Sequence, residues 1–273
     1  MNIRTIFESR DLTKLLEEDV ELRNIINVNI NDDRSSQIKK FSKLWYKAYR
    51  FNEPDSYYVL AFYYLFGIGT EKDLGMFVAS LKKAAILKHI KSILLLIKLY
   101  LFDVYLKYDE DKIIELLERL FKCVDDGELV KYENHIMFLI YLYQKQEQGK
   151  KAALSTVIKY KLVDKVTSSN EIEVFETTFT FPEEFKGELK NQLQRNQKIN
   201  KIKTKLLKDN YQAIDELLEL LNPDAPEDNY QALVDTYNQI KSAKSQKTIE
   251  QYRDTIIKII SCITSFKVYS DDE

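Results

Sequence analysis

The sequence predicts an all-helical protein, and three observations lead to this prediction. Apolar residues make up 45% of the 273-residue chain, which is enough to build a sizeable core. There are only 6 glycines and 4 prolines, whereas turn-rich β folds and α/β folds with glycine-rich phosphate loops usually contain more of both. The third observation is an internal repeat of about 36 residues, a period that is typical of stacked helical hairpins.

The repeat is clearest in the first half of the chain. Several positions keep their residue type 36 residues later, among them Ser56/Ser92, Leu60/Leu96, Tyr64/Tyr100, Phe66/Phe102 and Asp73/Asp109. At another position in the same register Gly67 becomes Asp103. A further copy follows a seven-residue insertion and places Leu139 and Tyr143 in the same register. Several matches in one register indicate repeated structural units.

Each unit is predicted to be a helical hairpin. In the clearest copy, residues 56–91, the first helix runs from about Ser56 to Phe66, and Gly67 supplies the left-handed backbone that closes its last turn. Asp73 is the predicted N-cap of the second helix. Because one hairpin cannot bury its apolar face alone, neighbouring copies must stack into a continuous core. We therefore expect a helical solenoid over residues 1–166.

The residues of this copy resemble a known family. The pattern consists of Leu60-Ala61, Tyr64, Gly67-x-Gly69, Asp73, Lys83-Ala84-Ala85 and His89. It is similar to the Sel1-like repeat, a relative of the tetratricopeptide repeat. The chain departs from the family at Ala61 and Lys88, where glycine is usual, at Phe77, where alanine is usual, and at Ser80, where an aromatic residue is usual. The resemblance implies a right-handed α-α superhelix that acts as a protein-binding scaffold and carries no catalytic residues.

The helical pattern stops between residues 167 and 182. Residues 171–174 alternate polar and apolar side chains, and Phe175, Phe179 and Phe181 follow. We favour an extended linker that the three phenylalanines anchor to the solenoid. The alternative is a strand that pairs with a partner or with a second copy of the chain.

Residues 183–273 are predicted to be helical again. We expect helices over about 183–208, 211–221, 230–243 and 248–266, with a break at Pro223 and Pro226. The last helix needs a packing partner because one of its faces carries only apolar side chains. These are Ile249, Tyr252, Ile256, Ile260, Ile263 and Phe266. A C-terminal helical bundle would bury that face.

The sequence offers few groups for catalysis or metal binding. No metallopeptidase or serine-nucleophile motif surrounds His89 or His135. We expect a packing role for His89, as the repeat family implies, and a capping or interface role for His135. Cys123 and Cys262 fit no paired metal or redox spacing. The acidic runs at 109–111 and 125–128 lack the spacing of a calcium loop. We therefore predict no metal, no cofactor and no enzymatic activity.

The first candidate binding surface is the inner face of the solenoid, lined by the first helix of each repeat. With the leucines and tyrosines of the repeat assigned to the core, four other side chains would lie on that face: Tyr58, Phe62, Lys98 and Tyr141. Exposed aromatic rings beside a cation are typical of binding hot spots. The alternative is that these side chains fill gaps between repeats.

The second candidate surface is a basic stripe on one helix. Five cations recur there at steps of three or four residues: Arg195, Lys198, Lys201, Lys205 and Lys208. Such a stripe would suit an acidic protein groove or a phosphate backbone. Because 41 basic and 43 acidic residues nearly cancel, there is no overall charge to attract nucleic acid or an anionic membrane. We favour the solvated side of an amphipathic helix.

Protein binding is therefore the predicted function, in the form of a scaffold or adaptor, a bacterial effector, or a toxin-neutralising protein. The alternatives are a nucleic-acid-binding protein that uses the basic stripe and an effector enzyme with its site in the C-terminal helices. The first 19 residues contain no long apolar segment, and the most apolar run, residues 93–106, is broken by Lys98 and Asp103. A cytoplasmic location without a membrane span is expected, and the sequence predicts no oligomeric state.

Overall fold

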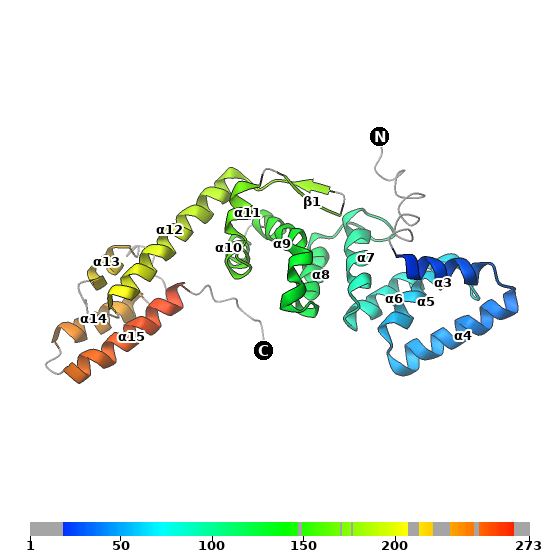
Figure 1. Cartoon of the computed structure of the whole chain (residues 1–273), viewed down its shortest axis with the longest axis horizontal. Coiled ribbons are helices and arrows are strands. Elements are labelled where there is room, and N and C mark those ends of the chain that lie inside the picture. Colours follow the sequence, from blue (N-terminus) through cyan, green and yellow to red (C-terminus); the bar gives the residue numbers. More distant parts are fainter. Residues whose placement is uncertain are drawn as a thin grey trace. The chain divides into compact units, whose positions relative to one another are not determined.

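The chain folds into helices, as the composition and the repeat predict. The computed structural model describes residues 19–146, 149–169, 171–175, 177–206, 213–220, 230–242 and 246–264. Helices make up most of this part of the chain, and its one sheet has two short strands (Figure 1). The all-α fold class is thus confirmed. Within the described ranges, no helix is both long enough and apolar enough to span a membrane.

Two compact units divide the chain. The first contains residues 1–143 and 173–178, and the second contains residues 144–172 and 179–273. We expected the solenoid to extend to residue 166. The difference arises because α10 (Lys150–Lys159) contacts α11 (Val163–Ser168), and α11 contacts α12 (Glu183–Leu206). These contacts join the segment 150–168 to the C-terminal helices.

The first unit is a series of helices joined by short loops. Its elements are α3 (Val20–Ile30), α4 (Arg34–Phe51), α5 (Pro54–Phe66), α6 (Leu74–Ile86), α7 (Ile90–Leu101), α8 (Glu110–Cys123), the 3-10 helix η1 (Asp126–Tyr132) and α9 (Glu133–Lys145). The helices α5 and α6 pack together, as do α7 and α8, which gives two helical hairpins (Figure 1). The element η1 lies in the predicted insertion between repeats.

The two hairpins repeat each other in backbone geometry. Helix α7 begins 36 residues after α5, and α8 begins 36 residues after α6. Asp73 and Asp109 both cap their helices, accepting hydrogen bonds of 2.9 and 3.0 Å from the amides of Met76 and Lys112. Three pairs of positions at the same offset share left-handed backbone: Asn52/Lys88, Gly67/Asp103 and Gly69/Tyr105. The predicted repeat is confirmed.

The predicted core positions of the repeat are buried. Leu60, Leu96 and Leu139 are at most 4% exposed, and Tyr64 and Tyr100 are also buried. The third tyrosine of the series, Tyr143, is half-buried, and its hydroxyl donates to a Glu118 carboxylate oxygen. Helix α5 lies at the centre of this core because it contacts α3, α4 and α6.

The segment after the repeats forms a hairpin of its own. Strand β1 (Ile172–Val174) pairs with β2 (Thr177–Phe179). The predicted phenylalanine anchors are buried, and in the first unit the Phe175 ring packs edge-on against His135, with ring centroids 4.7 Å apart. The expected linker thus contains strands, as the alternative interpretation held, but these strands pair with each other.

The second unit contains the predicted C-terminal bundle. Besides α10, α11 and α12 it includes α13 (Ala213–Leu220), α14 (Tyr230–Ser242) and α15 (Gln246–Thr264). Apolar side chains of α12, α13, α14 and α15 share one core, in which Leu206, Leu217 and Leu233 are fully buried. Ile256 and Ile260 of the predicted apolar face pack into it. The side chains of Ile263 and Phe266 lie outside the described residues.

Candidate functional site

Helix α4 leaves a large apolar surface exposed. Among its 18 residues Ala48 is fully buried, whereas five large apolar side chains are exposed. These are Ile38, Trp45, Tyr46, Tyr49 and Phe51, with 43% to 67% of each side chain accessible. Contiguous apolar patches on a soluble protein mark sites of interaction more often than scattered apolar residues do.

The rings on α4 are ordered by contacts with one another. Trp45 stacks on Tyr49 with ring centroids 4.7 Å apart and planes inclined by 27°. Tyr46 meets Phe51 edge-to-face at 5.8 Å. Tyr49 also packs edge-on against the buried Tyr57 of α5, at 5.2 Å. Such pairs restrict the orientations of the α4 rings, although much of each of these side chains is exposed.

Helix α4 is also strongly basic. Its 18 residues include six lysines and arginines and no aspartate or glutamate. Two of the cations serve the fold. Arg34 donates to the carbonyl oxygens of Gly67 and Thr70, at 3.2 and 3.3 Å, and Lys40 pairs with Asp32 at 2.5 Å. The other four are exposed: Lys39, Lys43, Lys47 and Arg50.

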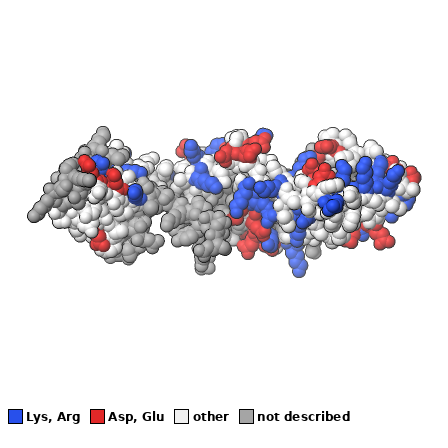
Figure 2. Space-filling view, turned by 90° about the horizontal axis from the view of Figure 1, so that it is seen from below, with Lys and Arg blue, Asp and Glu red and all other residues white. Residues whose placement is uncertain are grey.

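The exposed side chains form two neighbouring rows. Residues three, four or seven apart share a helix face, so Ile38 lies in line with Trp45 and Tyr49. We call these three residues the aromatic row, after the two rings in it. By the same spacing Lys39, Lys43 and Arg50 form a cationic row beside it, with Tyr46 at the same face. Figure 2 shows lysine and arginine side chains gathered on the N-terminal unit where α4 faces the viewer. We call these seven residues the α4 face.

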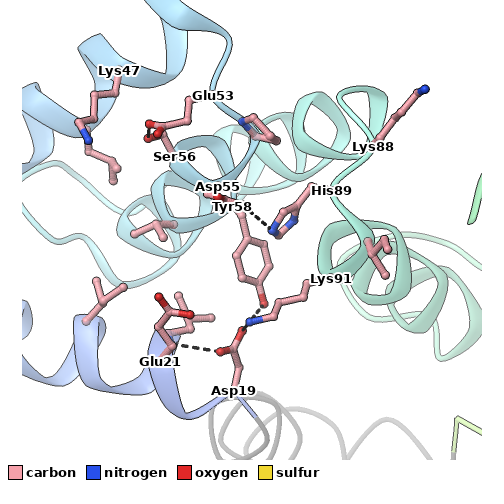
Figure 3. A pocket seen from close by; sticks show the side chains of 16 residues that line it. Asp19, Glu21, Lys47, Glu53, Asp55, Ser56, Tyr58, Lys88, His89 and Lys91 are labelled. Carbon is pink, nitrogen blue, oxygen red and sulfur yellow. Dashed lines mark hydrogen bonds and ion pairs between the residues drawn. The ribbon is translucent and has the colours of Figure 1, made fainter. Parts of the chain in front are cut away.

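A pocket adjoins α4 at Leu44 and Lys47, which lie outside the α4 face. It encloses about 590 Å³ between α3, α4, α5 and the start of α7, and Lys47 lies at its rim (Figure 3). Asp19 accepts from the Leu22 amide at 3.2 Å and pairs with Lys91 at 2.9 Å. The Tyr58 hydroxyl donates to the same carboxylate at 3.4 Å. These contacts tie α3 to α5 and α7.

The electrostatics of this network fit a structural role. Burial opposes ionisation of Asp19, but hydrogen bonds from Lys91 and Leu22 together with the Lys91 charge hold its pKa below the usual value. Burial, with the neighbouring Asp19 charge, raises the pKa of Tyr58. Both groups therefore keep one protonation state near neutral pH, which suits a permanent contact and not proton transfer.

His89 has neighbours that resemble a catalytic triad. Its Nδ1 lies 2.8 Å from Ser92 Oγ, and its Nε2 lies 3.3 Å from Asp55 Oδ1. Ser92 is completely buried, however, so its hydroxyl cannot reach a substrate. Nδ1 also accepts a hydrogen bond from the Ser92 amide at 3.2 Å, which makes His89 the N-cap of α7. The predicted structural role of His89 is confirmed, and burial lowers its pKa.

The inner-face cluster expected from the sequence is not assembled as a surface. Tyr58 and Phe62 are only 5% and 0% exposed, so the expectation that they are accessible is wrong. The reason is that α5 is covered by α3, α4 and α6, and the Tyr58 ring packs on Phe62 at 5.2 Å. The interpretation that such side chains fill gaps between helices fits these two. Lys98 and Tyr141 are half-buried on α7 and α9.

The basic stripe is only partly available. Lys198 and Lys201 are exposed on α12, and Arg195 is half-buried. Lys205 pairs with Glu216 of α13 at 2.6 Å, which neutralises one end of the stripe. Lys208 lies outside the described residues. In the part of the chain that the structure covers, no three His, Cys, Asp or Glu side chains are close enough to share a metal ion.

Comparison with known proteins adds a distant structural likeness. No protein-family model matches the sequence, and no curated protein matches it. The crystal structure of a Sel1 repeat protein from Oxalobacter formigenes matches 94% of this chain and 99% of its own, at 15% identity and a TM-score of 0.30. Likeness at this level carries no information on function. The helical repeat rests on the 36-residue offset of helix starts, caps and left-handed residues.

Proposed function

We propose that this protein is a non-enzymatic scaffold that binds a partner protein on the α4 face. The observation that carries the proposal is the exposed aromatic row on a helix whose other side is already packed. Ala48 of α4 is fully buried, and Phe41 contacts both Tyr63 and Tyr64 of α5. The exposed rings are therefore not needed to fill this core. Tryptophan and tyrosine are the residue types most enriched at binding hot spots.

The rigidity of α4 supports the same function. Arg34 and Gln37 fix its first turns, because Gln37 donates to the carbonyl oxygens of Ile30 and Asp32 at 3.1 Å, and Arg34 binds the loop after α5. A surface held by secondary structure and packed loops presents its side chains without a large ordering cost. An adaptor, an effector and a toxin-neutralising protein would all use such a surface, and the identity of the partner distinguishes them.

Affinity capture from the native cells tests this function. The wild-type chain is compared with a Trp45→Ala/Tyr46→Ala variant, since both side chains are exposed and neither fills the core. Loss of a hot-spot side chain costs at least about 2 kcal/mol, so the Kd for the partner should rise roughly 30-fold and its recovery should fall. The matched control is Tyr108→Ala, which removes a similarly exposed tyrosine away from α4.

The two variants must retain the helical circular dichroism signal and the unfolding midpoint of the wild type. Under that condition, a partner recovered from the wild type and from Tyr108→Ala but lost from the α4 variant supports the proposal. Equal recovery from all three proteins would remove the α4 face as the binding site.

A further inference from the structure

The charges beside the aromatic row indicate the chemistry of the partner. Lys39, Lys43 and Arg50 line one side of the row, and no acidic residue interrupts them. Cations this close to one another raise the local positive potential, which an anionic partner relieves. The aromatic row alone would suit many partners. The cationic row restricts the choice to one that also carries negative charge.

We infer that the segment docking on the α4 face is an acidic amphipathic helix of the partner protein, an inference that rests on the proposed function. Its apolar side chains pack on Trp45 and Tyr49, and its carboxylates face Lys39, Lys43 and Arg50. A helix suits this surface because the two rows on α4 are themselves set by helical spacing. Carboxylates three, four or seven residues apart on the partner then meet the cations in register.

The ends of α4 limit the length of the partner. Asp33 caps the helix at its start, and Glu53 follows its end, so carboxylates bound the basic stretch on both sides. An 18-residue helix is about 27 Å long. An acidic helix of similar length fits between these carboxylates, whereas a long polyanion that continues past either end meets like charge.

Ring geometry also favours a protein over single-stranded nucleic acid. Proteins that bind single strands present open ring faces on which successive bases stack, along a groove that follows the phosphates. On α4 one face of the Trp45 ring stacks on Tyr49, and the Tyr46 ring meets Phe51 edge-to-face. The cations lie on one convex helix. Edges of stacked rings beside lysines suit aliphatic and carboxylate side chains better than bases.

Trp45 provides a direct measurement because it is the single tryptophan of the chain. The probe is an 18-residue synthetic helix with glutamate at positions i and i+4 on one face and leucine beside it. Its control has lysine in place of every glutamate. We expect the acidic peptide to shift Trp45 emission to shorter wavelength as the ring loses water, with affinity that falls as salt rises. The lysine peptide should produce no shift.

Charge reversal locates the site. The Lys39→Glu/Lys43→Glu variant should bind the acidic peptide at least about tenfold more weakly than the wild type. The matched control is Lys198→Glu/Lys201→Glu, which reverses two exposed lysines on α12 and should bind as the wild type does. Lys39→Gln/Lys43→Gln, which adds no negative charge, should give an intermediate loss and serves if the reversal variant fails to fold.

Three results would overturn the inference. The first is no Trp45 shift with the acidic peptide although partner capture still depends on Trp45 and Tyr46, which leaves the proposed function intact. The second is tighter binding of single-stranded oligodeoxythymidylate or of phosphatidylserine vesicles than of the peptide. The third is equal peptide binding by the Lys39/Lys43 and Lys198/Lys201 variants. If capture also fails to depend on α4, the proposed function falls as well.

Discussion

Gly69 lies directly against the backbone of Gln37. A Cβ atom placed on Gly69 would be 2.3 Å from the Gln37 carbonyl oxygen and 2.9 Å from the amide nitrogen of Ile38. Gly69 also has a φ of +69°, in the left-handed region that favours glycine. The loop after α5 therefore packs on the main chain of α4. Arg34 of α4 also donates a hydrogen bond to the Gly67 carbonyl oxygen in the same loop, so two contacts fix the position of α4.

Substitution of Gly69 by alanine should destabilise the fold and displace α4. The methyl group must push the α4 backbone away, and the left-handed conformation adds a further penalty, so we expect a loss of about 2 to 4 kcal/mol in the free energy of unfolding. Urea unfolding measures it. Gly127→Ala is the control, because a Cβ there meets nothing within 4 Å. Equal stability of the two variants would show that the Gly69 contact is not tight.

A left-handed lysine before α7 offers a stabilising substitution. Lys88 has a φ of +67° and Asn52, at the same place in the preceding repeat, has a φ of +51°. Asparagine tolerates this region better than lysine does. Lys88→Gly should therefore raise the free energy of unfolding by about 0.5 to 1 kcal/mol, and Asn52→Gly by less. Urea unfolding midpoints of the two variants and the wild type measure both changes. A Lys88→Gly protein less stable than the wild type would mean that lysine makes a compensating contact.

The two phenylalanines Phe62 and Phe51 allow a core position to be compared with a surface position. Phe62 is 0% exposed in α5, whereas Phe51 is 67% exposed at the end of α4. Phe62→Ala should cost about 3 to 5 kcal/mol through lost burial and a cavity. Phe51→Ala should change stability by less than about 0.5 kcal/mol, as exposed sites usually do. Thermal unfolding compares them. Similar losses at both positions would mean that the Phe51 side chain is covered by another part of the chain.

Local signals were predictable from the sequence. The caps Asp73 and Asp109 act over three residues, and the left-handed turn at Gly67 follows from residue type, so both appear in the pattern of the repeat. The 36-residue register then predicts which leucines and tyrosines are buried. Helix ends in the C-terminal bundle follow from similar start and break signals, and the expected helices lie within a few residues of α12 to α15.

Which helix face is exposed depends on contacts that the register does not contain. Trp45 and Leu81 occupy equivalent repeat positions, yet Leu81 is 0% exposed and Trp45 is 43% exposed. Helix α6 packs against both α5 and α7, whereas α4 packs against α5. Tyr58 was expected at the surface and is buried, because α3 is brought over it and Asp19 accepts from its hydroxyl. The one sequence signal for the α4 face was the acid-free, aromatic-rich run at 34–52.

His135 couples the stability of the first unit to pH. Its ring lies between Tyr132 and Phe175, with centroids 5.6 and 4.7 Å away. Burial, together with the positive charge of Lys98, lowers the pKa of His135 from 6.5 to about 4. The unfolded chain therefore binds this proton at a higher pH than the folded chain does. The contribution of neutral His135 to the free energy of unfolding is therefore present above about pH 6.5 and is lost as the pH drops toward 4.

The size of this loss can be isolated in a window where carboxylates do not interfere. The pKa of Asp19 lies below 3.8, so its contribution is retained above pH 5. Between pH 7 and pH 5 the His135 shift should lower the free energy of unfolding by about 2 kcal/mol. A His135→Gln variant keeps a polar side chain but does not titrate, and its urea midpoint should fall less over this window. His89, whose pKa is also lowered, contributes to both proteins alike. If wild type and variant show the same pH dependence, the pKa of His135 does not differ between the folded and the unfolded chain.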